Sequence, residues 1–216
     1  NGALRTKALN YAAWPYISSA IRRLIREQPS DLIVSTHPLL VSPVLQGLGK
    51  RRPPFITVVT DLVSTHAWWF DKRADLTMVP TKDACHRALS CGLDARQVKV
   101  VGLPVSQQFC HSAPNIAALR RELGWHLSVD TVLLLGGGDG IGPLREVAYG
   151  LAHAGLPIQL AVVCGRNERL RAYLESQTWP LETHVYGFVS NMPTMIMAAD
   201  LVVTKAGPSS IIEALT

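Results

Sequence analysis

The sequence predicts an α/β protein with two doubly wound, parallel-sheet domains. Short apolar runs alternate with segments of helical apolar spacing along the whole 216-residue chain. The runs are continuously apolar rather than alternating, which is typical of parallel strands covered by helices on both faces. The alternation pauses once, at a proline-containing stretch, and then resumes. Together these observations predict two Rossmann-like domains that face a ligand cleft.

The first domain is predicted to span residues 1–104. A helix is expected over residues 16–28, where Ile17, Ile21 and Leu24 recur at helical spacing and the arginines fall on another face. Strands and helices then alternate. The apolar runs predict strands at 31–36, 55–60, 76–79 and 98–102, and the periodic segments predict helices near 39–49 and 82–91.

A linker is predicted at residues 105–115, and the second domain at 116–216. The linker has few periodic apolar positions. Beyond it, a helix near 115–123 leads into further strands, each followed by a helical segment. The expected strands are 131–135, 158–164, 183–187 and 200–204.

Composition limits the classes of partner. Lysine and arginine exceed aspartate and glutamate by five charges, which suits a nucleic acid, an anionic membrane surface or a phosphorylated small molecule. Nucleic acid is the weakest of these, because the basic residues are not interleaved with stacking aromatics. The four cysteines lack paired spacing, so we expect reduced thiols in a cytosolic setting. No metal site is predicted, because no metal-ligand spacing occurs.

A glycine turn follows the first strand of the second domain. Gly136, Gly137 and Gly138 come directly after an apolar run, and Pro143 is placed in the first turn of the next helix. Backbone N–H groups at such a turn suit a phosphate, although a tight turn without a ligand explains the pattern equally well. The spacing matches neither the dinucleotide fingerprint nor the phosphate loop of ATPases.

A second strand end also carries anion-binding groups. The stretch from 200 to 215 supplies Lys205, Gly207, Ser209 and Ser210 before a helix, with Glu213 about one turn further on. A cation, backbone donors and hydroxyls suit a phosphate, and a carboxylate can accept from sugar hydroxyls. The loops with Arg166 and Phe188 end the two intervening strands. Four such strand ends predict one nucleotide across the carboxyl edge of the sheet.

In the first domain, one strand end combines acid, base and aromatic residues. Asp61 and His66 could assist removal of a proton from an acceptor, although a lone histidine is more often structural. The aromatic run Trp68, Trp69 and Phe70 suits either an acyl-chain groove at a lipid interface or ordinary packing. His37, after the preceding strand, suits either a cleft lining or a simple turn.

Seven motifs in order give the chain a family resemblance. THPLL, TVVTDLVSTHAWWF, VVGLPV, LLLGGGDGIGP, CGRN, YGFV and TKAGPSSIIEA resemble the diacylglycerol glycosyltransferases, closest to the monogalactosyldiacylglycerol synthases, in glycosyltransferase family 28. The resemblance implies the GT-B fold, a UDP-sugar held mainly by the second domain, and inverting transfer of galactose or glucose to diacylglycerol, with no required cofactor or metal.

The resemblance also implies residue roles. The turn Gly136–Gly138 with Ser209 and Ser210 would face the diphosphate, Phe188 would lie beside the uracil, and Glu213 would hold the ribose. The family's main catalytic histidine would precede Asn1, and a sugar-contacting loop would follow Thr216, so we expect a piece of a longer protein that is inactive alone. Asp139 replaces the more usual glutamate, and the PSS segment at 208–210 replaces PGT.

Two alternatives remain open at this point. One is transfer of N-acetylglucosamine from its UDP-sugar to a polyprenyl-linked cell-wall precursor. The other is a non-catalytic module that binds a nucleotide sugar or anionic lipid. The favoured hypothesis places the protein peripherally on the cytoplasmic side of an anionic membrane, either a bacterial inner membrane or a plastid envelope.

Overall fold

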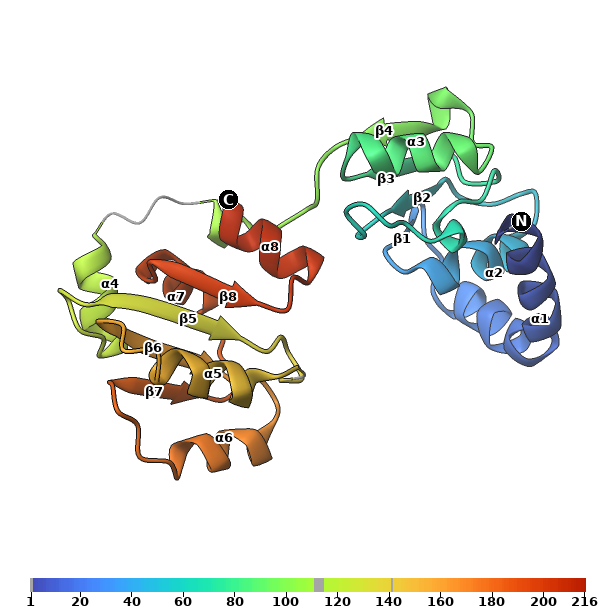
Figure 1. Ribbon diagram of the computed structural model, residues 1–216. Helices are drawn as coiled ribbons and strands as arrows, with labels where there is room; N and C mark the ends of the chain where they lie inside the picture. Colours follow the sequence, from blue (N-terminus) through green and yellow to red (C-terminus); the bar gives the residue numbers. More distant parts are fainter. Residues whose placement is uncertain (1, 111–114, 141) are drawn as a thin grey trace. The chain divides into compact units, whose positions relative to one another are not determined.

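A computed structural model describes residues 2–110, 115–140 and 142–216, and the chain divides into two compact units. Unit 1 is Asn1–Pro104 and unit 2 is Val105–Thr216 (Figure 1). Within the predicted linker, residues 107–109 form the short helix η3 (Gln107–Phe109). Residues 111–114 of that linker lie outside the described part.

Unit 1 contains one parallel four-stranded sheet. The strands lie in the order β1-β2-β3-β4, so each pairs with its neighbour in the sequence. Their bounds are β1 (Ile33–Ser35), β2 (Phe55–Val58), β3 (Leu76–Val79) and β4 (Val98–Val100). The helices are α1 (Gly2–Glu27), α2 (Pro38–Leu48) and α3 (Lys82–Ser90), with short helices η1 (Ala67–Trp69) and η2 (Ala95–Gln97).

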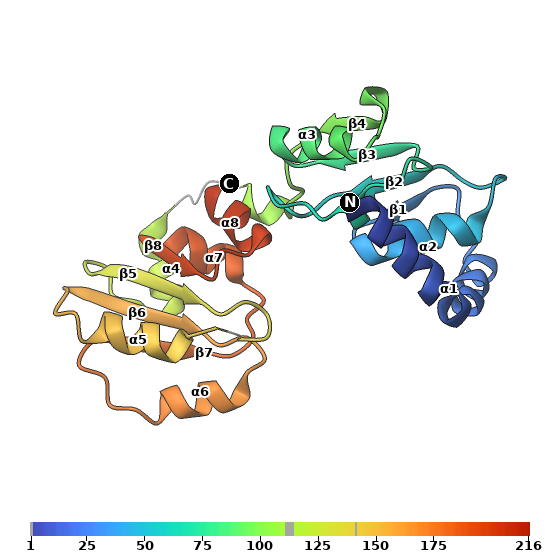
Figure 2. The ribbon, with the colours of Figure 1, turned by 45° about the vertical axis from the view of Figure 1, so that its right-hand side comes forward.

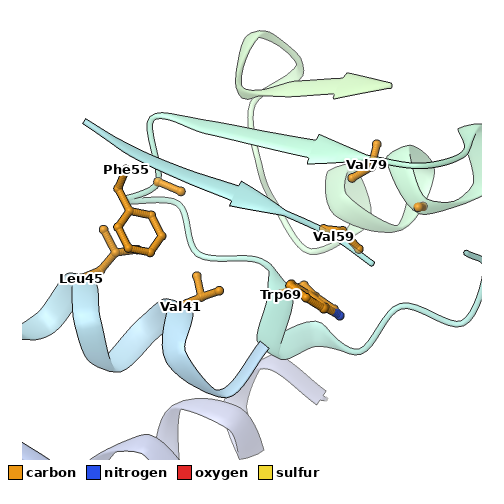
Figure 3. Close-up of a cluster of buried hydrophobic side chains, with 8 residues drawn as sticks. Val41, Leu45, Phe55, Val59, Trp69 and Val79 are labelled. Carbon is orange, nitrogen blue, oxygen red and sulfur yellow. The ribbon is translucent and has the colours of Figure 1, made fainter. Parts of the chain in front are cut away.

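The core of unit 1 lies between α2 and the sheet. Val41 and Leu45 of α2 point toward Phe55 of β2, and each is at most 2% exposed (Figure 3). Trp69 of η1 closes the same cluster, and its side chain is 1% exposed. Burial of these large apolar side chains is the main force that holds α2 and η1 against the strands.

Unit 2 contains a second parallel sheet, in the order β7-β6-β5-β8. The strands are β5 (Asp130–Leu135), β6 (Ile158–Val163), β7 (Thr183–Tyr186) and β8 (Leu201–Thr204). The helices are α4 (Ile116–Leu123), α5 (Leu144–Ala152), α6 (Glu168–Glu175), α7 (Met192–Ala198) and α8 (Pro208–Leu215). The two parallel sheets confirm the predicted α/β class.

Helices cover both faces of the second sheet. Side chains of α5 and α6 form one core with β5 and β6, and side chains of α4 and α7 form another on the opposite face (Figure 2). Because β5 and β6 are buried on both faces, apolar side chains follow one another without alternation, as in Leu133 and Leu134 at 3% exposure or less.

Two predicted helix boundaries were wrong. Helix α1 begins at Gly2 rather than near Tyr16, because the preceding residues favour helix and continue the same element through Pro15. Pro143 does not lie in the first turn of α5. It precedes the helix, with ψ of 44°, and α5 begins at Leu144, because the glycine turn folds back on β6 before the helix starts.

Candidate functional site

The glycine turn lies where the strand order of the second sheet reverses. From β5 the chain moves outward to β6 and β7, then returns to place β8 on the other side of β5. The carboxyl ends of β5 and β8 therefore diverge toward helices on opposite sides. In open parallel sheets this position is the usual ligand site.

Two glycine turns from neighbouring strands pack backbone against backbone at this edge. A Cβ on Gly140 would lie 2.1 Å from the Cys164 carbonyl oxygen, and one on Gly165 would lie 2.5 Å from the carbonyls of Gly137 and Gly138. The Arg166 N–H donates to the Gly138 carbonyl at 2.9 Å. Only glycine permits such an approach, and both turns also have positive φ.

This packing separates carbonyls from amides. The carbonyls of Gly137 and Gly138 face the β6 turn, and the Gly140 carbonyl accepts from the Asn167 side chain at 3.3 Å. Among the described residues, no acceptor pairs with the N–H groups of Gly137, Gly138 and Asp139. Unpaired amides clustered in one turn form a concave donor set for an anion. They belong to a turn that precedes α5, whose first residue is Leu144.

Lys205 and α8 add a second set of groups to the same edge. A Cβ on Gly137 would lie 3.2 Å from Lys205 Cε, so the lysine side chain lies directly over that turn. The first hydrogen bond within α8 runs from Ile211 N–H to the Gly207 carbonyl at 3.0 Å. The amides of Ser209 and Ser210 therefore have no partner inside the helix, and its dipole favours negative charge there.

A pocket opens between these groups. Its lining combines the glycine turns with Ser210 and Glu213 of α8 and with an apolar floor, namely Leu135, Val163, Val189 and Met192. Its volume is about 150 Å³, below the roughly 300 Å³ at which sites for whole small ligands begin. It can take one part of a nucleotide sugar, and the remainder would lie over the adjoining turns.

Sequence reasoning missed the four floor residues. Leu135 and Val163 end strands, Val189 lies in the loop after β7, and Met192 begins α7. Only the sheet order brings Val189 and Met192 beside Leu135 of β5. Gly165 could have been found, because the predicted strand at 158–164 ends directly before it.

Arg166 and Phe188 lie together beside the glycine turn. The guanidinium lies over the Phe188 ring, 4.6 Å from its centre, and 3.7 Å from the Asp139 carboxylate. Phe188 is 59% exposed, so its ring offers apolar surface to a ligand. Cation–π contact with Arg166 orients it.

In unit 1, two histidines follow neighbouring parallel strands and cap the helices after them. His37 Nδ1 accepts from Leu39 N–H at 3.3 Å, and His66 Nδ1 accepts from Trp68 N–H at 3.2 Å. A ring nitrogen that accepts carries no proton, so each neutral imidazole holds its proton on Nε2. Both rings are exposed and can donate a hydrogen bond outward.

Asp61 and Trp69 are joined by a hydrogen bond. The Trp69 Nε1–H donates to the Asp61 carboxylate at 2.7 Å, and the indole is buried in the core of unit 1. The expected contact of Trp69 with lipid was therefore wrong for this unit, since burial leaves the ring no free surface. Trp68 and Phe70 are half-buried, and their lipid contact stays a prediction, as does catalysis by Asp61 and His66.

The part of the chain that the structure describes offers neither a metal-ion cluster nor a membrane-spanning helix. Within residues 2–110, 115–140 and 142–216, no three histidine, cysteine or acidic side chains are grouped to hold a metal ion. In the same part of the chain, no helix has the length and apolar content needed to cross a membrane.

Two protein-family models match the chain. The family model "Monogalactosyldiacylglycerol (MGDG) synthase" matches residues 4–105, and "Glycosyltransferase family 28 C-terminal domain" matches residues 131–216. The chain belongs to the monogalactosyldiacylglycerol synthase family. The two matches fall on units 1 and 2 respectively.

Curated plant relatives align along most of the chain. A monogalactosyldiacylglycerol synthase of Spinacia oleracea is 38% identical over 218 residues, which is 95% of this chain and 42% of the relative. Monogalactosyldiacylglycerol synthase 3 of Arabidopsis thaliana is 39% identical over 212 residues, which is 93% of this chain and 45% of the relative. Both relatives are chloroplastic. The chain spans less than half the length of these synthases.

Solved structures agree with the fold of this family member. HepE of Anabaena in complex with UDP-glucose superposes with a TM-score of 0.60 at 17% identity, over 92% of this chain and 60% of HepE. MurG of Acinetobacter baumannii gives 0.59 at 16% identity, over 91% and 52%. These similarities show the fold and confirm the predicted GT-B class.

Proposed function

We propose that the full-length protein transfers a galactosyl group from UDP-galactose to the free hydroxyl of diacylglycerol. The observation that carries this is the pocket in unit 2. Gly137 and Gly138 of the glycine turn and Ser210 of α8 line this pocket at the switch point of the sheet, and the Lys205 side chain lies against Gly137. The nucleoside diphosphate of a sugar donor matches this set of groups.

Each group has a defined role in this proposal. The amides of Gly137 and Gly138 and the Lys205 ammonium bind the diphosphate, whose negative charge grows as the bond to the sugar breaks. Fixed donors aimed at developing charge stabilise the transition state more than the ground state. Glu213 accepts from the ribose hydroxyls, and the Phe188 ring lies beside the base.

The family names favour the sugar and the acceptor. The relatives are monogalactosyldiacylglycerol synthases, which favours galactose over glucose and diacylglycerol over other acceptors. We assign the acceptor side to the carboxyl edge of unit 1, where His37 and His66 present Nε2–H donors beside exposed Leu39 and Val63. Apolar surface with a few hydrogen-bond donors suits a glycerolipid.

We further propose that the protein acts peripherally at the surface of an anionic membrane. Arg22 and Arg23 of α1 are exposed, and so are Tyr16, at 86%, and Leu24, at 57%. Basic residues near an anionic surface contribute about 1 kcal/mol each to membrane binding, and aromatic side chains favour the interface.

The first experiment is a calorimetric titration of the full-length protein with UDP, with ADP and GDP as controls. Selective binding of UDP supports the donor class. A folded protein that binds none of the three nucleotides would contradict the proposal at its first step.

The second experiment tests both substrates. The protein is incubated with UDP-galactose or UDP-glucose as donor and with diacylglycerol or a polyprenyl-linked precursor as acceptor. The lipid products are then separated and identified by mass spectrometry. We expect galactosyldiacylglycerol. Product from the polyprenyl acceptor alone would overturn the acceptor, and UDP binding without any product would indicate a non-catalytic module.

A further inference from the structure

Ala206 has an unusual backbone conformation beside the nucleotide pocket. Its φ is +60°, and within residues 2–110, 115–140 and 142–216 no other non-glycine residue has a positive φ. A residue with a Cβ avoids this region because the Cβ crowds the following carbonyl oxygen. Such a conformation persists only where the surrounding structure imposes it, and outliers of this kind cluster at ligand sites.

The left-handed turn at Ala206 joins Lys205, which lies over the glycine turn, to α8, which lines the pocket. Strand β8 ends at Thr204 and α8 begins at Pro208, so only three residues separate the strand from the helix. Lys205, immediately before Ala206, lies over Gly137. An extended residue at 206 would carry the chain straight past the β5 turn, and α8 would start further from it.

The residues after Ala206 lead directly into α8. Residue 207 is back in the extended region, with φ of −63° and ψ of 141°, and caps α8 without a side-chain hydrogen bond. Ser210 in the first turn of α8 and Glu213 in the second both line the pocket. The bend at Ala206 therefore fixes the direction of Lys205 and the origin of α8 together.

We propose that Ala206 is a positioning residue for the nucleotide site, which holds Lys205 over the glycine turn and aims α8 at the pocket. The proposal rests on the function proposed above. Ala206 acts through its backbone, since its side chain is one exposed methyl group. Glycine would also reach the left-handed region but would leave it freely, so alanine gives a turn that is better ordered before the ligand binds.

Substitutions that differ in left-handed tolerance test this in the full-length protein. UDP affinity is measured by calorimetry, and folding by circular dichroism, for Ala206→Gly, Ala206→Asn and Ala206→Val. Glycine and asparagine enter the left-handed region readily, whereas β-branched valine does not. We expect UDP affinity within about threefold of the unsubstituted protein for the first two, and at least about tenfold weaker for valine.

Gly124→Val is the matched control. Gly124 has φ of +73° at the end of α4, and nothing lies within 4 Å of its Cβ position. Valine there imposes the same type of strain in the same unit, away from the pocket lining. We expect a lower melting temperature and unchanged UDP affinity. Equal loss of affinity in both valine variants would overturn the positioning role.

If Ala206→Val does not fold, a double-mutant cycle tests the positioning role instead. Lys205→Gln is measured in the unsubstituted protein and in Ala206→Gly. We expect the loss of UDP affinity to be smaller in the glycine background, because the lysine is less well directed there. Equal losses would overturn the proposal. Failure of the proposed function is recognised separately, since the unsubstituted, folded protein would then not bind UDP.

Discussion

Arg120 of α4 and Asp200, the residue before β8, form an ion pair across 80 residues of sequence. Arg120 Nε–H also donates to the Ala198 carbonyl at 2.9 Å, and the Asp200 carboxylate accepts the Thr131 N–H at 2.6 Å. The pair thus links α4, the end of α7 and the start of β8 to β5. It fixes β8 beside the strand that carries the glycine turn.

Arg120→Met is expected to lower the free energy of unfolding by about 2 kcal/mol. The substitution leaves the Asp200 carboxylate without its cation and the Ala198 carbonyl without the Arg120 donor. The Thr131 N–H still binds the carboxylate, and the partial exposure of Asp200 keeps the loss below that of a fully buried pair. Urea denaturation measures it. Arg96→Met is the control, because that arginine is 91% exposed beside Asp94 and should change stability little. Similar effects of both substitutions would contradict the buried role of Arg120.

Gly137→Ala is expected to weaken UDP binding about tenfold. Gly137 has φ of +72°, and an added Cβ would meet Lys205 Cε at 3.2 Å, so the methyl group strains the turn and displaces the lysine. Calorimetry measures the affinity. In Gly150→Ala the new Cβ has no neighbour within 4 Å inside α5, so helix stability should rise by about 0.5–1 kcal/mol with UDP affinity unchanged. Unchanged affinity in Gly137→Ala would exclude the turn from the site.

The fold was largely predictable because buried parallel strands have continuously apolar sequences. The run at 131–135 became β5, and the run at 158–164 became β6 without its last residue. The order β7-β6-β5-β8 was not predictable, since apolar pattern reports burial but not which strands pair. That order decides which loops become neighbours.

The site was predictable where it depends on residue type and not where it depends on packing. Lys205, Ser210 and Glu213 were proposed from cation, hydroxyl and carboxylate chemistry at strand ends, and the structure places them around one pocket or its glycine turn. Trp69 was misplaced because an aromatic run reads the same at a surface and in a core. Ala206 carried no signal, since alanine rarely marks a left-handed turn.

Glu213→Ala is expected to weaken UDP binding about tenfold while binding of 2′-deoxy-UDP changes little. A carboxylate that accepts from a ribose hydroxyl loses its effect when that hydroxyl is absent. Titration of UDP and 2′-deoxy-UDP into the unsubstituted protein and into Glu213→Ala gives the energetic coupling between the carboxylate and the 2′-hydroxyl. Ala214→Ser, at the exposed next residue of α8, should leave both affinities unchanged. Equal loss for the two nucleotides in Glu213→Ala would contradict a hydrogen bond from the ribose 2′-hydroxyl to Glu213.

Cys164 is expected to resist alkylation at pH 8, whereas Cys110 reacts. Burial raises the pKa of the Cys164 thiol to about 11, and the side chain is fully buried. At pH 8 about one thousandth of this thiol is then ionised, and the thiolate is the reactive form. Cys110 is exposed. Iodoacetamide labelling with peptide mass spectrometry measures both sites, and fast labelling of Cys164 in folded protein would contradict its burial.

Thr57→Val and Thr131→Val are expected to change stability in opposite directions, although both threonines are fully buried in central strands. The Thr57 hydroxyl has no hydrogen-bond partner among the described residues, so an isosteric methyl group should raise the free energy of unfolding by about 1 kcal/mol. The Thr131 hydroxyl accepts from Gln159 Nε2 at 2.8 Å. Removal of this hydroxyl should lower the free energy of unfolding by a similar amount.

Urea denaturation of the two variants under the same conditions measures the sign of each change in the free energy of unfolding. Valine keeps the shape and the β-branching of threonine, so strand propensity and packing volume contribute little to the difference. A loss of stability in Thr57→Val would mean that the hydroxyl finds a partner in solution, for which an internal water is the simplest choice. A gain in Thr131→Val would mean that Gln159 is satisfied by the carbonyls of His126 and Val129 alone.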